Sequence, residues 1–310
     1  MKDTIYQLES SLHLINGSNR VRNLKTIGFN RERAITMTLL TNEYVLLVGV
    51  VLIAYISFKK EALTKTGMAA SIVIGGIITF AFSLYGLLIL ASFFLSSSIL
   101  GRKLDGTQGR HETFEEKGEK RDAKQVLANG GWAAAASLLF ILTDDMIWLL
   151  AFISSLASAN SDTWASAIGK QSHSPPRRLL TKEVVPVGQS GGTTRLGNLG
   201  ALMGSAFVVL IGYLLINMQD FGSVPVPWFV WCLIIMVGFI SQWIDALSGD
   251  FLQALYQCNK CGRFTERNIH CKKSTTIVKG RMWMDNDFVN HLCTVFGFIL
   301  GAMIGVYFNI

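Results

Sequence analysis

The residues of this sequence that could do chemistry gather in five groups, each beside long apolar segments. In the first, Ser158–Gly169, small and polar residues recur at three- and four-residue spacing, which places them on one face of a helix. An ionisable residue within an apolar helix is costly and usually faces a cavity or a partner. A helix-packing seam of small residues would explain the serines and alanines. Asn160 and Asp162 together favour a functional site over that seam.

The second group, Ser241–Asp250, is a rough echo of the first and also carries a carboxylate in an apolar segment. Asp162 and Asp245 lie sixteen and seventeen residues after the starts of their segments, so we expect them at almost the same depth. Magnesium binds a few carboxylates and keeps water or phosphate oxygens as its other ligands. Asp162, with Asp245 or Asp250, is therefore the predicted magnesium site.

The third group is a glycine-rich loop directly before an apolar segment. Glycines let backbone N–H groups approach an anion, and the following helix start offers free N–H groups and the positive end of its dipole. A flexible connector would also explain Gly-Gly, but the place of the loop beside the Asp162 helix favours an anion site. Lys182 and Arg195 flank the loop and are expected to pair with phosphate. Thr193 or Thr194 would cap the helix. The predicted phosphate-binding residues of the loop are Gly188, Ser190, Gly191, Gly192 and Thr193.

The fourth group is scattered along the chain, at the ends of several apolar segments. Each member alone would be ordinary interface polarity, but together they predict a ring of amides, carboxylates and bases at one face. The members are Ser96, Ser97, Ser98, Arg102, Lys103, Asn129, Gly130, Gly131, Asp285, Asn286, Asp287 and Asn290.

The fifth group is a set of thiols in a basic loop. Cys258 and Cys261 have the spacing of a zinc knuckle, and His270 and Cys271 follow. Two interpretations stay open: a structural zinc site, or unrelated thiols. The adjacency of His270 and Cys271 counts against zinc, because neighbouring residues rarely reach one metal easily. An odd total of five cysteines, with Cys232 inside an apolar segment, argues against a disulfide framework.

The apolar segments that position these groups predict an integral membrane protein. The chain is half apolar and only 16% charged, whereas soluble proteins are about 25% charged. Its apolar blocks reach the roughly 20 residues that cross a bilayer as helix. Met1–Arg33 reads as a polar tail, and residues 34–310 as one all-α polytopic domain. The eight expected spans are Ile35–Phe58, two within Gly67–Leu100 that turn near Ser83–Gly86, Val126–Leu142, Met146–Ile168, Leu196–Ile216, Trp228–Gly249 and Phe288–Tyr307.

Charge predicts the side on which the polar loops lie. With these spans, loops 101–125, 169–195 and 250–287 share one side and carry nineteen Lys and Arg residues, whereas the opposite connections, 143–145 and 217–227, carry none. This split predicts that the loops face the cytoplasm, and it explains the net charge of +7 without a nucleic-acid partner. The six Lys and Arg residues of the N-terminal tail disagree, because eight spans place that tail on the other side.

Several motifs occur in the order typical of one family, and from about Gly67 to its end the sequence resembles the transmembrane protein 19 family (domain of unknown function 92). The motifs are Phe94–Ser98, Gln125–Gly130, Ser161–Ser166, Val185–Gly192 and Asp285–Asn290. The family includes the plant phytyl-phosphate kinase, which resembles CTP-dependent prenol kinases with a Gly-Asp-x-x-Ala-Ser-x-x-Gly stretch, then a Lys and a Gly-Ser loop. Here Ser161 replaces the usual Gly and the gap before the loop is longer, which leaves the nucleotide open.

The resemblance implies a membrane-embedded kinase that transfers a phosphoryl group from a nucleoside triphosphate, with CTP expected, to an isoprenyl monophosphate. The glycine loop, Lys182, Arg195 and Lys103 would hold the phosphates, and Asp162 with Asp245 or Asp250 would hold Mg²⁺. The lipid tail would lie between helices in the bilayer. A phosphate acceptor needs no strong base, whereas an alcohol would need a carboxylate such as Asp162 or Asp250.

A transporter is the alternative function, with Asp162 and Asp245 as ion or substrate ligands. Two echoing helix ends suggest the internal repeats that transporters contain. However, transporters hold their ionisable groups near the bilayer midplane, whereas these carboxylates are expected near one face. A purely structural protein would leave the convergence of the motifs on that face unexplained.

Overall fold

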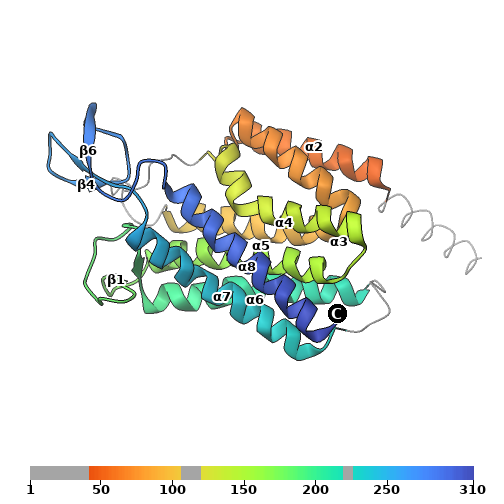
Figure 1. The fold of residues 1–310 in the computed structure, drawn as a ribbon. Helices are drawn as coiled ribbons and strands as arrows, with labels where there is room; N and C mark the ends of the chain where they lie inside the picture. Colours follow the sequence, from red (N-terminus) through yellow and green to blue (C-terminus); the bar gives the residue numbers. More distant parts are fainter. Residues whose placement is uncertain (1–41, 106–119, 219–225) are drawn as a thin grey trace, which may run out of the picture. The chain divides into compact units, whose positions relative to one another are not determined.

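The computed structural model of the protein describes residues 42–105, 120–218 and 226–310 (Figure 1). The chain divides into two compact units, Met1–Leu46 and Leu47–Ile310. The helices and strands belong to the second unit, except for the first turn of the helix that leads into it. The expected polar tail, Met1–Arg33, and most of the loop 101–125 lie outside the described residues.

Helices dominate the described part of the chain, which confirms the expected helical membrane fold. Five of them, α3, α4, α6, α7 and α8, are long and apolar enough to cross a bilayer. Large apolar side chains such as Leu210 and Met303 are exposed on them, and apolar surface of this extent is typical of contact with lipid. The helices are α2 (Glu43–Lys59), α3 (Lys65–Asp105), α4 (Ala123–Thr143), α5 (Ile147–Gly169), α6 (Arg195–Met218), α7 (Trp228–Phe251) and α8 (Asn286–Phe308).

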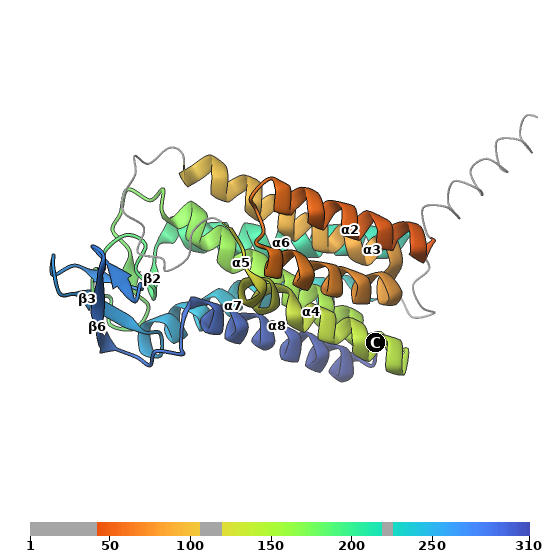
Figure 2. The same ribbon diagram turned by 90° about the horizontal axis from the view of Figure 1, so that it is seen from above.

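Helix α3 doubles back on itself at Ser83, which has φ 51° and ψ −142°. A side chain at Gly67 would collide with the backbone of Arg121, whose guanidinium donates to Ser97 Oγ at 3.2 Å. Gly67 and Ser97 would lie about 45 Å apart in a straight helix, so the two halves must run antiparallel (Figure 2). The break lies where a turn was expected, near Ser83–Gly86. The count of eight spans stays a prediction, because Ile35–Phe58 lies partly outside the described residues.

Helix α5 lies at the centre of the unit, with α4, α6, α7 and α8 packed around it (Figures 1 and 2). Its buried serines let the neighbours approach closely: Gly297 and Gly301 of α8 lie against Ser158 and Ser154 of α5. Glycines of α6 pack on it in the same way. A seam of small residues therefore runs along this helix, and it continues past Asp162, where Gly197 and Gly200 of α6 lie against Ala165 and Ile168.

Two small sheets connect the helices at one end of the bundle (Figure 1). Strands β1 (Arg177–Arg178) and β2 (Gly192–Thr193) pair across the loop between α5 and α6. The loop between α7 and α8 forms an antiparallel four-stranded sheet in the order β4-β3-β6-β5. The sequence pattern predicted only a polar loop here. The strands are β3 (Leu255–Cys258), β4 (Phe264–Thr265), β5 (Ile269–His270) and β6 (Lys273–Lys279).

Candidate functional site

A cavity of about 340 Å³ opens where α3, α4, α5, α7 and α8 meet the glycine loop. Residues from all of the first four sequence groups line it, although more than 190 positions separate the ends of that set. The polar residues of its wall are Ser97, Arg121, Gln125, Asn129, Asp162, Thr163, Ser166, Lys170, Gln189, Ser190, Thr193, Thr194, Asn198, Gln242, Asp245, Glu266, Asn286 and Asn290. Of the expected ring of polar residues, Ser97, Asn129, Asn286 and Asn290 line this one concave site, and the other members that the structure describes are not among its lining residues.

Two carboxylates from different helices meet in this cavity. Asp162 of α5 and Asp245 of α7 interact directly through their side chains, and both line the wall. The Oδ1 atom of Asp245 is buried without a hydrogen-bond partner. Two carboxylates in contact repel each other unless a proton or a cation lies between them.

The donor atoms around this pair are oxygens, which suits a hard divalent cation. Gln125 presents a buried Oε1 that also has no hydrogen-bond partner, and Asn290 lies in the same wall. Magnesium prefers carboxylate, amide and phosphate oxygens. Asp162 and Asp245 therefore fit a Mg²⁺ ion, with room in the cavity for phosphate oxygens beside it.

The glycine loop has a backbone that only glycine adopts easily. Gly188 and Gly191 have φ of 84° and 85°, in the region that favours glycine. A Cβ at Gly191 would lie 2.7 Å from Cβ of Asp250 and 2.9 Å from its Cα. Thr194 ends the loop and caps α6, because its Oγ1 accepts from Gly197 N at 2.9 Å. The loop thus lies directly on the end of α7.

Asp250 packs against Gly191 of this loop and does not line the cavity. The carboxylate is only 6% exposed and forms ion pairs with Arg178 and Lys279, the latter at 3.2 Å. Burial and the nearby charge of Arg178 lower the pKa of the Lys279 amine, while Glu266 acts in the opposite direction. Of the three aspartates predicted to act, Asp162 and Asp245 therefore face the cavity, and Asp250 is held in an ion pair beneath the glycine loop.

The other predicted residues divide into those in the cavity wall and those outside it. Asn129, Asn286 and the glycine loop are in the wall. Lys103, Lys182 and Arg195 are not among the lining residues. The Nζ of Lys182 instead donates to the carbonyl of Leu179 at 2.6 Å.

Two of the predicted polar residues, Asn160 and Asp285, make hydrogen bonds that stabilise the fold. Asn160 is fully buried: its Nδ2 donates to Gly204 O at 2.8 Å and its Oδ1 accepts from Ser96 Oγ at 3.1 Å. Asp285 caps α8 by accepting from Phe288 N at 3.0 Å. Both residues shape the walls of the site from outside the cavity.

Sequence reasoning missed several polar residues of the wall. Arg121 and Lys170 bring positive charge to it, and Glu266 brings a carboxylate. Lys170 directly follows Gly169, so extending the first group by one residue would have included it. In the sequence, Arg121 stands out only as one of the charges of a basic loop. No sequence signal connects Glu266 to the glycine loop, because the contact depends on the fold of the cysteine-containing loop.

The model of the family described as "Integral membrane protein DUF92" matches residues 48–298, which is most of the chain. This protein belongs to the DUF92 family. The match agrees with the resemblance seen in the motifs and with the membrane-spanning helices of the structure.

Curated relatives of this DUF92 protein come from archaea, plants and cyanobacteria. An uncharacterized membrane protein of Methanocaldococcus jannaschii is 27% identical over 87% of this chain and 97% of its own length. Protein PGR of Arabidopsis thaliana is 27% identical over 83% of this chain and 93% of its own. Protein VTE6, chloroplastic, from the same plant is 23% identical over 79% of this chain and 64% of its own. No solved structure matches the chain significantly.

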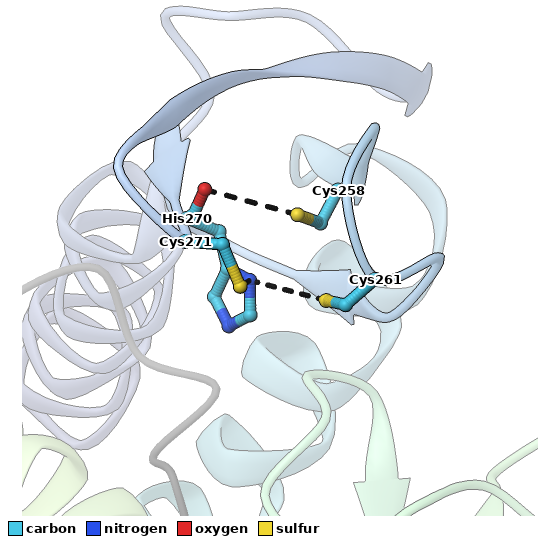
Figure 3. A group of neighbouring side chains, drawn as sticks. All are labelled: Cys258, Cys261, His270 and Cys271. Carbon is cyan, nitrogen blue, oxygen red and sulfur yellow. Dashed lines mark hydrogen bonds between the residues drawn. The ribbon is translucent and has the colours of Figure 1, made fainter.

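The DUF92 protein also carries a compact cluster of thiols beside the cavity. The ligand atoms of Cys258, Cys261, His270 and Cys271 all lie within 4.8 Å of one another (Figure 3). Hydrogen bonds from the backbone N–H groups of Cys261 and Lys260 lower the pKa of Cys258 to about 6. Hydrogen bonding with Cys261 raises the pKa of Cys271. The structure thus brings together all four residues of the fifth sequence group.

Proposed function

We propose that this DUF92 protein is a membrane-embedded kinase that transfers a phosphoryl group from a nucleoside triphosphate, CTP, to an isoprenyl monophosphate. One observation carries the proposal: the Asp162 and Asp245 pair and the glycine loop line the same cavity at the ends of membrane-spanning helices. A carboxylate pair suits a metal ion, and a glycine loop at a helix start suits phosphate. The family resemblance to a prenyl-phosphate kinase supplies the reaction class.

In this mechanism, the chain's own residues orient and neutralise the phosphates. Backbone N–H groups of the glycine loop and the start of α6 would contact the nucleotide phosphates, and Arg121 and Lys170 would add positive charge from the cavity wall. Asp162 and Asp245 would hold Mg²⁺, which neutralises charge on the transferred group when it is bound. Positioning and charge neutralisation are the main requirements of phosphoryl transfer.

The acceptor phosphate attacks without help from a strong base. An oxygen of the isoprenyl monophosphate forms a bond to the γ-phosphorus, the bond from that phosphorus to the bridging oxygen breaks, and CDP leaves with the electron pair. This agrees with the wall of the cavity, where the described part of the chain places no histidine. His291, for example, accepts from Trp132 Nε1 at 3.1 Å outside the wall.

The test uses the full chain purified in detergent, with Mg²⁺, labelled CTP and isoprenyl monophosphates of several lengths. Labelled isoprenyl diphosphate is the expected product, and each other nucleoside triphosphate is offered in turn as donor. Asp162→Asn should abolish the product while the protein stays folded. The matched control is Asp145→Asn, because Asp145 is exposed at the start of α5, where its Oδ1 accepts from Ile147 N at 3.1 Å.

One result would overturn the metal site, and another would overturn the kinase reaction. Wild-type turnover in Asp162→Asn would refute the magnesium assignment. Failure of every nucleotide and acceptor, together with solute flux into proteoliposomes without nucleotide, would instead support a transporter.

A further inference from the structure

The cysteine cluster has the ligand geometry of a closed tetrahedral metal site. Cys261 Sγ and Cys271 Sγ lie 3.4 and 3.3 Å from His270 Nδ1, and Figure 3 shows the sulfurs of both cysteines beside the imidazole. In a tetrahedral zinc site, the usual bond lengths put sulfur and nitrogen ligands roughly 3.6 Å apart. Cys258, which is buried, completes the set from the side of β3. None of the five cysteines forms a disulfide.

The first half of the cluster is a tight turn between β3 and β4. Cys258 Sγ accepts from Lys260 N at 3.4 Å, and Gly262, at φ 72°, follows the second cysteine. The Gly262 N–H donates to Cys258 O at 2.9 Å. This turn points both sulfurs to one side, as a zinc knuckle requires.

The second half of the cluster is the adjacent pair His270 and Cys271. Neighbouring His and Cys residues rarely bind one metal, but the backbone here lets both side chains reach the same point. His270 pairs with Lys273 across a two-residue hairpin turn, and both turn residues, Cys271 and Lys272, have positive φ, 54° and 60°. Such turns normally take Asn and Gly, because other residues are strained there. The turn brings Cys271 Sγ to the same side as the His270 ring, and a shared ligand would hold it in this unfavourable conformation.

The sheet that carries the cluster has almost no apolar core. Within the bounds of the sheet, Leu255–Lys279, the buried residues are Tyr256, Cys258, Thr265 and Glu266, whereas Phe264 and Ile269 are 47% and 67% exposed. Modules of this size rarely hold their shape without a metal or disulfide. With no disulfide present, the four converging ligand atoms are the feature that could hold these strands together.

We propose that Cys258, Cys261, His270 and Cys271 bind one Zn²⁺ ion through three thiolates and the Nδ1 atom of His270. All four coordination positions are filled by protein, which is typical of a structural site and leaves none for catalysis. The proposal is independent of the kinase reaction.

The ion also determines the position of a residue in the cavity wall. Glu266 lies in the chain between Cys261 and His270, so the metal closes the loop that carries it. Its Oε1 accepts from Ser190 Oγ at 2.6 Å and from Ser190 N at 3.2 Å. The zinc site therefore holds the glycine loop through Glu266, and Glu266 is a positioning residue.

Metal content tests the site itself. The full chain, purified without chelators, should contain about one zinc per chain. Cys261→Ser should lower the affinity for zinc at least about tenfold, so that a chelator removes zinc from the variant before the wild type. Cys232→Ala is the matched control, since Cys232 is an exposed free cysteine on α7, and it should keep the metal. Replacement of zinc by Co²⁺ in the wild type should give thiolate-to-cobalt absorption, which needs no folded variant. A folded wild type that holds neither metal, or a Cys261→Ser protein that holds zinc as tightly as the wild type, would overturn the site.

Hydrogen exchange at residues 186–194 tests the connection to the glycine loop. Removal of zinc should speed exchange of the Ser190 amide in the wild type, because Glu266 would no longer be held against it. In Glu266→Ala the exchange should already be fast, and removal of zinc should add nothing. Thr265→Ala, which truncates the neighbouring buried side chain, should behave as wild type. Unchanged Ser190 exchange after zinc loss would refute this connection, whatever the outcome for kinase activity.

Discussion

The cavity and the cysteine cluster lie at the same end of the bundle, yet they are built in opposite ways. The cavity collects oxygen ligands from helices far apart in the chain, such as Asp162 and Asp245. The cluster collects sulfur and nitrogen ligands from fourteen consecutive residues, Cys258–Cys271. The first suits Mg²⁺ and a phosphate, and the second suits Zn²⁺. The cavity therefore depends on the packing of the whole bundle, whereas the cysteine cluster depends on two tight turns.

Substitution in the two regions should affect turnover to very different degrees. We expect Asp245→Asn to lower kcat on the order of 10³-fold or more, as loss of a charge-stabilising group at the reacting atoms does. Cys258→Ser should lower it about tenfold at most, because the cluster reaches the cavity only through Glu266. Steady-state kinetics with CTP and an isoprenyl monophosphate measure both. Equal losses in the two variants would show that the cluster takes part in the reaction.

Asp250→Asn should destabilise the protein without removing any group from the cavity wall. It leaves Arg178 and Lys279 without their shared carboxylate, and breaking a buried ion pair costs about 3–5 kcal/mol. The midpoint of thermal unfolding in detergent should therefore fall clearly. Asp245→Asn is the comparison: it relieves repulsion with Asp162, so its midpoint should match or exceed that of the wild type. A lower midpoint for Asp245→Asn than for Asp250→Asn would contradict this assignment.

Gly191→Ala should weaken nucleotide binding more than it weakens the fold. The φ of 85° and the approach to Asp250 leave no space for a methyl group, so the loop must shift. We expect KM for the nucleotide to rise roughly tenfold, from loss of about 1–2 kcal/mol of phosphate contacts. Gly131→Ala is a suitable control, because a Cβ there meets no atom closer than 3.9 Å. An unchanged KM in Gly191→Ala would place the phosphates elsewhere in the cavity.

His270→Cys should have the smallest effect. Four thiolates also form a closed tetrahedral zinc site, so zinc content should stay near one per chain and the unfolding midpoint should change little. His270→Ala, which removes the ligand, should lose most of the metal. Metal analysis of the two variants side by side measures the difference. Zinc retained in His270→Ala would mean that the imidazole is not a ligand.

Local pattern was enough to predict the membrane fold and the composition of each group. The break of α3 at Ser83 agrees with the expected turn, since the largely apolar stretch Gly67–Leu100, 34 residues long, exceeds a comfortable single span. The cytoplasmic side predicted from charge stays a prediction. Helix α5 is less apolar than the five membrane-spanning helices because it carries serines, Asn160 and Asp162. These polar residues are mostly buried against other helices, since α5 lies at the centre of the unit.

What the sequence by itself determined is the chemistry available: carboxylates at matched depth, a glycine loop before a helix, and four metal-binding side chains at close spacing. The tertiary structure alone decided which groups meet. Asp245 and Asp250 lie about 140° apart around one helix, so sequence separates their faces but cannot say which one meets Asp162. Packing turned Asp245 into the cavity and Asp250 onto Arg178. Likewise, only the fold of the sheet placed Glu266 on Ser190. The spacing of residues along the sequence cannot predict a contact between two segments so far apart in the chain.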